Sequence, residues 1–179
     1  MRIRTDSTFL GVIDIQEKLL AVMQDAAKVV QAATRLARAA DLLGVARLLV
    51  EQYPEGLGRT PGPIAAVCPE PTSKRCFSAM GCDGFCRAIP PSADTCVLVG
   101  LETHVCVLQT ALDLMERGIT VFVAADGVTS RHPIDHEMAL RRLEASGVML
   151  TTSESVLFEW CQSADHPRFQ DVRRLVVDR

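Results

Sequence analysis

The segment from Val97 to Met115 (VLVGLETHVCVLQTALDLM) places the tightest constraint on what this chain can fold into. Residues 97–99 form a short, continuous apolar run, which is typical of a strand buried on both faces of a parallel sheet. Gly100 interrupts the run, and Gly118 lies where a helix commonly ends. Between them, apolar residues recur at helical spacing, at Val105, Leu108, Leu112 and Met115. The segment therefore predicts a strand, a tight turn and a helix.

Cys106 falls in the first turn of that predicted helix. Unpaired backbone N–H groups and the positive end of the helix dipole favour ionisation of a thiol there, and the thiolate is the nucleophilic form. The same N–H groups could hold an oxyanion. The alternative is that Cys106 is a small buried hydrophobic residue, as free cysteines often are. This segment alone leaves both interpretations open.

The rest of the chain alternates between buried strands and helices. Further strands are predicted at residues 9–13, 46–50, 119–125 and 148–152, and helices at residues 25–43, 133–145, 154–161 and 167–177. Proline and glycine are so dense between Tyr53 and Glu70 that we expect a long loop without regular structure. Residues 74–78 predict a short strand, and residues 81–92 a loop with one helical turn near Phe85. This order predicts an α/β fold, a three-layer α/β/α Rossmann-like arrangement with a mainly parallel six-stranded sheet.

Length and composition restrict the classes of function. A chain of 179 residues favours a single domain, residues 1–179, and a net charge of −3 argues against a partner of nucleic acid or anionic membrane. No apolar stretch is long enough to span a bilayer, and no segment of signal-peptide type follows the N-terminus. The 7 cysteines are typical of reduced thiols rather than of a disulfide framework. Their spacing lacks the paired C-x2-C motifs of common structural zinc sites. We expect a cytoplasmic protein that acts on a small molecule.

Polar residues lie at the predicted ends of separate strands. Asp14 follows the first strand, where ligands bind in α/β sheets, although an aspartate there could equally be a turn or capping residue. Lys74 begins the short strand after the long loop, and Cys106 follows the central strand. Together they make chemical sense, because a lysine favours the thiolate and a carboxylate can take the thiol proton and later return it.

The motifs around these residues resemble the isochorismatase-like cysteine hydrolase superfamily. The resemblance is carried by FLGVIDIQEKL around Asp14, KRCFSAM around Lys74, VGLETHVCVLQTALDLMERG around Cys106, ADGVTSRHPIDHEMALRRLEASG, and TTSESVLFEW near the end. EQYPEGLG after the second strand looks like the small isochorismatase-domain proteins in particular. The resemblance runs along nearly the whole chain.

The resemblance implies an Asp–Lys–Cys triad. Asp14 would be the general acid and base, Lys74 the orienting charge, and Cys106 the nucleophile. It also implies a cis peptide bond at Leu101–Glu102, with the backbone N–H groups of Glu102 and Cys106 as the oxyanion hole. Relatives are usually dimers or larger, so a homo-oligomer is expected, with the amphipathic stretch 153–179 as a candidate contact.

The sequence departs from the nicotinamidases of this superfamily. Those enzymes carry an aspartate and several histidines as metal ligands after the second strand, where this chain reads EQYPEGLGRTPGP. We therefore expect no metal and no other cofactor, and nicotinamide becomes a doubtful substrate. Glu102 replaces a small residue of many relatives; it either faces away from the site or selects a cationic or hydrogen-bond-donating substrate.

Two functions remain in competition. The first is a metal-independent cysteine hydrolase acting on an amide or ureido C–N bond of a small molecule, in which Cys106 is the most reactive of the thiols. The second is a catalytically silent relative that serves as an interaction or thiol-sensing module. Intact Asp14, Lys74 and Cys106 favour the enzyme, because a silent relative would tolerate their loss.

Overall fold

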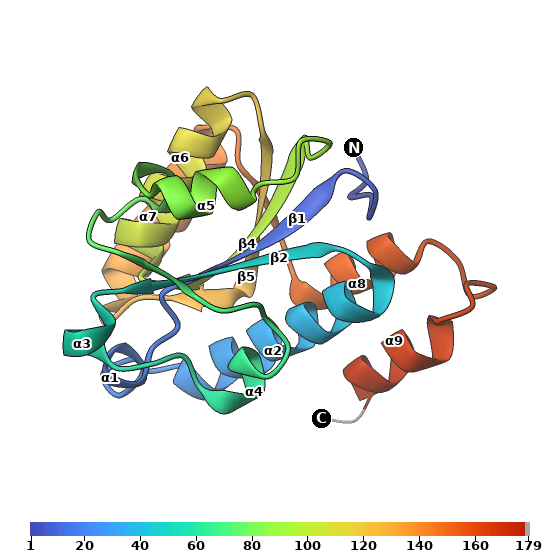
Figure 1. Ribbon diagram of the computed structural model, residues 1–179, viewed down its shortest axis with the longest axis horizontal. Helices are drawn as coiled ribbons and strands as arrows, with labels where there is room; N and C mark the ends of the chain where they lie inside the picture. The colour runs from blue at the N-terminus through green and yellow to red at the C-terminus, as the bar shows by residue number, and fades with distance from the viewer. Residues whose placement is uncertain (178–179) are drawn as a thin grey trace.

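The computed structural model describes residues 1–177 and is built on a parallel sheet of 6 strands (Figure 1). The strands are β1 (Thr8–Ile13), β2 (Ala46–Gln52), β3 (Thr72–Lys74), β4 (Thr95–Leu101), β5 (Thr120–Thr129) and β6 (Met149–Thr151). Their order in space is β3-β2-β1-β4-β5-β6, and every neighbouring pair is parallel. The predicted α/β fold is confirmed, with a sheet that is wholly rather than mainly parallel.

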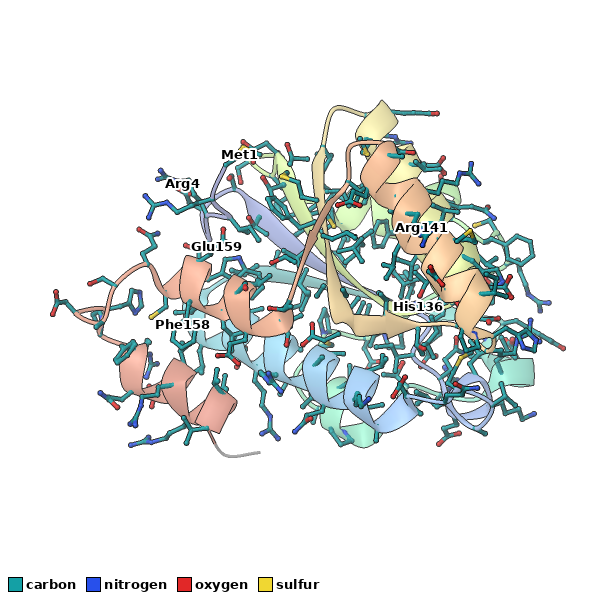
Figure 2. The ribbon with its side chains drawn as sticks, turned by 180° about the vertical axis from the view of Figure 1, so that it is seen from behind. Met1, Arg4, His136, Arg141, Phe158 and Glu159 are labelled. Atoms are coloured by element: carbon teal, nitrogen blue, oxygen red, sulfur yellow. The ribbon has the colours of Figure 1, made fainter. Side chains whose placement is uncertain are left out.

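Helices cover both faces of the sheet (Figures 1 and 2). One layer contains α2 (Ala26–Leu43), α8 (Ser153–Cys161) and α9 (Phe169–Val177), and the other contains α5 (Asp83–Ala88), α6 (Leu108–Glu116) and α7 (Pro133–Ala145). The short helix α1 (Glu17–Leu20) follows β1. The C-terminal helix is described only to residue 177, so the last part of the stretch 153–179 lies outside the described residues.

Each layer encloses its own apolar core, because successive residues of a strand point to opposite faces. Leu10 and Val12 of β1 pack on the α2 side, whereas Phe9 and Ile13 pack on the α6 side. On α6 the buried residues are Leu108, Thr110, Ala111 and Leu114, whereas the predicted stripe members Leu112 and Met115, and Val105 just before the helix, are only partly buried. The buried face of this helix is therefore rotated from the predicted one.

Two predictions in the β2–β4 connection are wrong. The stretch 53–70 contains the single-turn helices α3 (Pro54–Leu57) and α4 (Gly62–Ala65), because proline is well suited to the first turn of a helix, where its missing N–H is not needed. The strand predicted at 74–78 lies earlier, at Thr72–Lys74, where it pairs with Val50–Gln52 of β2. Lys74 is consequently the last residue of a strand rather than the first.

Gly100 marks a close approach of the two central strands. Its φ is +142°, and a Cβ atom there would lie 2.0 Å from the backbone oxygen of Ile13. The pairing of β4 with β5 shifts register between Leu98 and Gly100 and resumes at Gly100–Val128, so β5 continues past its predicted end at Asp126. A residue without a side chain is thus required where β4 leads into the site.

The chain order reverses between β1 and β4, and this makes their carboxyl ends a topological switch point. The chain first builds the sheet outward through β2 and β3, then returns to add β4 on the other side of β1. In open α/β sheets, ligands bind at such switch points. Within residues 1–177, no helix is both long and apolar enough to cross a membrane.

Candidate active site

Asp14 lies directly after β1, at one side of this switch point. Its φ of 51° is in the left-handed region, which aspartate tolerates better than most residues, and its N–H donates to the carbonyl of Val50 at 3.1 Å. This turn directs the carboxylate into the interior, where the residue is 0% exposed.

Lys74 reaches this carboxylate from the edge strand. Its Nζ donates to Asp14 Oδ2 at 2.7 Å, and both side chains are 0% exposed. Further acceptors are Gln52 Oε1 at 2.7 Å and the carbonyl oxygens of Cys76 at 3.2 Å and Phe77 at 2.9 Å. The chain turns after Lys74 and aims these two carbonyls back at the ammonium, which is why no strand continues there.

Two glutamines that sequence reasoning missed support the lysine. The N–H of Gln52 donates to Gln16 Oε1 at 2.8 Å, and Gln16 Nε2 donates to the carbonyls of Gln52 at 3.0 Å and Gly58 at 2.8 Å. This arrangement fixes the end of β2, and with it the Gln52 side chain that accepts from Lys74. Their positions in the sequence could have identified them, because Gln16 stands two residues after Asp14 and Gln52 is the last residue of the strand next to β1.

Cys106 faces Asp14 and Lys74 from the other side of the switch point. It lies in a π-helical turn, Thr103–Val107, that precedes α6, and it is 7% exposed. Its thiol is close enough to Asp14 and Lys74 for hydrogen bonding and charge from both to act on its pKa. The structure therefore brings together the three side chains that the sequence singled out.

The electrostatics of Cys106 differ from the prediction. Burial and then the negative charge of Asp14 raise the pKa of the thiol to about 12, although Lys74 acts in the opposite direction. The prediction that the helix end and the lysine make this thiol easily ionised is wrong for the free protein, whereas its reactivity relative to the other six thiols stays a prediction. Burial and the charge of Asp14 together outweigh the Lys74 ammonium.

Asp14 has the properties of a proton acceptor. Burial raises the pKa of its carboxyl group, and the Lys74 ammonium opposes that rise. Its Oδ1 is buried and makes no conventional hydrogen bond to the described residues. One carboxylate oxygen is thus held by Lys74, whereas the other is open for the proton of a neighbouring group.

Glu102 begins the turn between β4 and the π-helical segment. The Leu101–Glu102 peptide bond is cis, as the family resemblance implied. The Glu102 carboxylate accepts hydrogen bonds from Arg131, from its backbone N–H at 3.1 Å and its Nε at 3.2 Å. The charge of this acid is therefore balanced by Arg131.

The end of β2 and the residues that follow it do not fit a metal site. Glu51 is 2% exposed, and its carboxylate accepts from Thr60 N–H at 2.7 Å, Thr60 Oγ1 at 2.9 Å and Arg59 Nη1 at 3.0 Å. Protein donors thus occupy the carboxylate that a cation would need. In the part of the chain that the structure describes, no three His, Cys, Asp or Glu residues are grouped as potential ligands.

Residues 8–155 match the family model described as the Isochorismatase domain. The chain belongs to the isochorismatase family. The isochorismatase domain-containing protein 2 of Bos taurus is 40% identical over 177 residues, which cover 99% of this chain and 86% of the relative. The likeness to this relative thus extends over nearly the whole chain.

Solved structures of the isochorismatase family share the fold. A MAR1 ribonuclease from Caenorhabditis elegans superposes with a TM-score of 0.93 at 36% identity, covering 99% of this chain and 93% of that one. The YcaC gene product of Escherichia coli, described as an octameric hydrolase, superposes with a TM-score of 0.85 at 21% identity over 99% of this chain and 96% of that one. This chain thus has the same fold as both of these proteins.

Proposed function

We propose that this protein is a cysteine hydrolase that cleaves an amide or ureido C–N bond of a small molecule without a metal ion. Asp14, Lys74 and Cys106 are its catalytic residues, and the backbone N–H groups of Glu102 and Cys106 form the oxyanion hole. The observation that carries this proposal is the fully buried Asp14–Lys74 ion pair beside the Cys106 thiol at the switch point of the sheet.

The reaction begins with a protonated thiol. Cys106 Sγ attacks the substrate carbonyl carbon as its proton passes to Asp14 Oδ1, the oxygen that Lys74 does not hold. The Glu102 and Cys106 N–H groups stabilise the negative oxygen of the tetrahedral intermediate. Asp14 returns the proton to the departing nitrogen, the C–N bond breaks, and a thioester to Cys106 remains.

Water completes the cycle. Asp14 accepts a proton from water as the water oxygen attacks the thioester carbonyl, and the C–S bond breaks with return of a proton to Cys106 Sγ. The net reaction consumes one water and gives an acid and an amine. Lys74 keeps Asp14 oriented and offsets negative charge that accumulates between the carboxylate and the substrate oxygen.

A panel of primary amides, N-carbamoyl compounds and ureides, analysed by mass spectrometry for hydrolysis products, tests the proposal. Cys106→Ala should abolish turnover, and Lys74→Met should reduce kcat about 10²–10³-fold, the usual loss for one stabilising group. Cys86→Ala removes a thiol outside the triad and is the matched control. Activity should persist after exhaustive chelation.

Turnover that survives Cys106→Ala would contradict the proposed nucleophile. Activity that chelation abolishes and zinc restores would contradict the metal-free mechanism. A correctly folded protein that turns over nothing in the panel would favour the silent alternative. RNA belongs in the panel because the C. elegans relative is named a ribonuclease, although the net charge of −3 opposes binding of a polyanion.

We further propose that residues 1–179 act as one domain, in the cytoplasm, and as a homo-oligomer. The single sheet with its two covering layers supports the assignment of one domain. Two observations support the homo-oligomer. The YcaC protein is octameric, and the side chains of Phe158 on α8 and Val177 on α9 are exposed.

A further inference from the structure

Three successive side chains at the start of the turn that carries Cys106 reach one neighbouring segment. These pairs are Glu102–Arg131, Thr103–His136 and His104–Ser130. Their partners all lie within residues 130–136, which lead from β5 into the first turn of α7. Helix α7 also packs against the π-helical turn itself. A segment that contributes no residue to the triad thus anchors the turn that holds Cys106.

Within the π-helical turn, one backbone acceptor is shared between two donors. The Glu102 carbonyl accepts from the N–H groups of both Val105, at 3.1 Å, and Val107, at 3.3 Å. Turns of this kind are rare, and they occur frequently at the functional sites of proteins. The side-chain contacts with residues 130–136 are therefore expected to contribute to the geometry of this turn.

Thr103 is the most buried of the three anchoring residues, because it is 0% exposed, whereas Glu102 is 8% exposed and His104 is half-buried. Its hydroxyl lies 2.9 Å from Nδ1 of His136, near the N-terminal end of α7 (Figure 2). Burial lowers the pKa of His136, although Asp25 acts in the opposite direction, so the imidazole is uncharged at neutral pH and Nδ1 can accept this hydrogen bond. A buried hydroxyl that loses its partner is unfavourable, so this contact constrains Thr103.

We propose that His136 is a positioning residue for the proposed hydrolysis, and that through Thr103 it holds the π-helical turn in the geometry that presents Cys106 to Asp14. This inference rests on the proposed function, and it assigns to His136 no contact with the substrate or the reacting atoms. Loss of the contact should have two effects of opposite sign. Turnover should fall because the nucleophile is misaligned. Alkylation of Cys106 should accelerate, because a loosened turn admits water and lowers the thiol pKa that burial has raised.

Variants of His136 test the proposal in the full-length protein. His136→Leu removes the ring nitrogen, whereas His136→Asn retains a polar group near the position of Nδ1. In His136→Leu, iodoacetamide at pH 8.5 should alkylate Cys106 about threefold faster or more, which corresponds to a fall of about half a unit in the thiol pKa. On any amide or ureide that the wild type hydrolyses, kcat should fall about tenfold or more with little change in KM. His136→Asn should be close to the wild type in both measurements.

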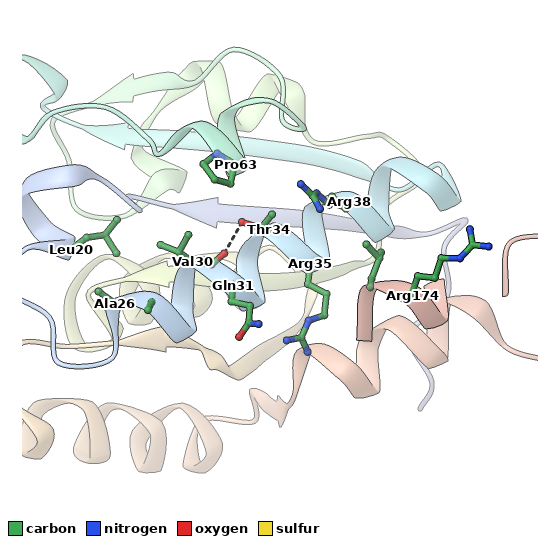
Figure 3. A pocket seen from close by; sticks show the side chains of 11 residues that line it. Leu20, Ala26, Val30, Gln31, Thr34, Arg35, Arg38, Pro63 and Arg174 are labelled. Atoms are coloured by element: carbon green, nitrogen blue, oxygen red, sulfur yellow. Dashed lines mark hydrogen bonds between the residues drawn. The ribbon is translucent and has the colours of Figure 1, made fainter. Parts of the chain in front are cut away.

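Thr103→Val breaks the same contact from the other side and keeps the shape of the side chain, so the test does not depend on the folding of one variant. The double variant Thr103→Val/His136→Leu should differ little from either single variant, because the two changes remove one shared contact. Thr34→Val is the matched control. The Thr34 hydroxyl donates to the Val30 carbonyl at 2.7 Å on α2, beside a groove of about 630 Å³ that no triad residue lines (Figure 3). In this control, alkylation of Cys106 and turnover should match the wild type.

Alkylation of Cys96, which is 0% exposed, separates a loosened turn from a general loss of stability. The proposal requires alkylation to accelerate at Cys106 and not at Cys96. Equal acceleration at both thiols would overturn it, and so would unchanged alkylation of Cys106 in His136→Leu and Thr103→Val. A His136→Asn variant that behaves like His136→Leu would also contradict it. If the wild type hydrolyses nothing in the panel, the proposed function fails, but the alkylation rates still decide whether His136 holds the turn.

Discussion

At the residue scale, the Cys106 thiol lies between a carboxylate and an ammonium group that act on it in opposite directions. The negative charge of Asp14 raises the pKa of the thiol, the Lys74 ammonium lowers it, and burial adds to the effect of Asp14. The free protein therefore holds a protonated thiol at neutral pH. In the proposed mechanism, attack by Cys106 is therefore coupled to proton transfer and does not start from a thiolate that is already present.

Variants of these neighbours should change the reactivity of Cys106 in opposite senses. Asp14→Asn removes the charge that raises the thiol pKa, so alkylation of Cys106 by iodoacetamide at pH 8.5 should accelerate. Lys74→Met should slow it. The thiolate fraction changes about tenfold for each unit of pKa, so effects of about tenfold are expected. Peptide mass spectrometry gives the rate at each cysteine.

Cys82 is the internal control, because this half-buried thiol should react at the same rate in all three proteins. Slower alkylation of Cys106 in Asp14→Asn would mean that the role of Asp14 as proton acceptor, on which the proposed mechanism relies, outweighs the effect of its charge on the thiol pKa, and the electrostatic argument would then be wrong.

The sequence was sufficient to find the three side chains but not their protonation states. Asp14, Lys74 and Cys106 stand at strand ends, and parallel strands bring such ends to one edge of the sheet. The degree of desolvation depends on every residue packed around the thiol, which no local pattern encodes. Gln52 was missed for a similar reason, since its side-chain oxygen accepts from Lys74, its pairing partner on the neighbouring strand β3, and that pairing is not visible in either segment alone.

At the element scale, the predictions succeeded where a segment decides its own structure. Strand β1 is a continuous apolar run, and α2 ends at Gly44 in a left-handed conformation, so both are predicted within about one residue. The prediction placed strand β3 too late in the sequence, because these three residues form a strand only by pairing with β2. A short edge strand is specified by its partner rather than by its own residues.

Gly100→Ala should be strongly destabilising. The new Cβ would meet the Ile13 oxygen between two buried central strands, and φ is unfavourable for any side chain. A loss of about 3 kcal/mol or more in the free energy of unfolding is expected, measured by urea denaturation. Gly62→Ala in α4 is the matched control, because a Cβ atom added there would have no heavy atom within 4 Å, and it should be neutral or slightly stabilising. Equal stability of the two variants would show that β1 and β4 can move apart at Gly100 at little cost in free energy, and would contradict this prediction.

At the scale of the whole molecule, buried thiols tie stability to alkaline pH. Burial raises the pKa of Cys68 to about 11, that of Cys106 to about 12, and those of Cys96 and Cys161 above their ordinary values. The folded state therefore keeps protons that the unfolded chain releases near pH 9. The stabilisation is complete below that pH and is lost as pH rises through the folded-state values.

Urea unfolding between pH 8 and 11 should accordingly show a falling free energy. Each thiol that is ionised only in the unfolded state contributes a slope of about 1.4 kcal/mol per pH unit. Cys96→Ala should start from a lower stability, because it leaves a small cavity, but should have a shallower slope above pH 9. An unchanged slope in that variant would show that other groups govern the alkaline transition.

The two halves of the candidate site are anchored to parts of the sheet that differ in stability. Asp14 and Cys106 follow β1 and β4, which are paired on both sides in the middle of the sheet, whereas Lys74 ends the edge strand β3, which pairs with β2 alone. Edge segments open locally at a lower free energy than central strands. Fraying of β3 would withdraw the ammonium while the carboxylate and the thiol remain together. How long the three side chains stay together therefore depends on how long β3 stays paired with β2, and not on the global stability of the fold.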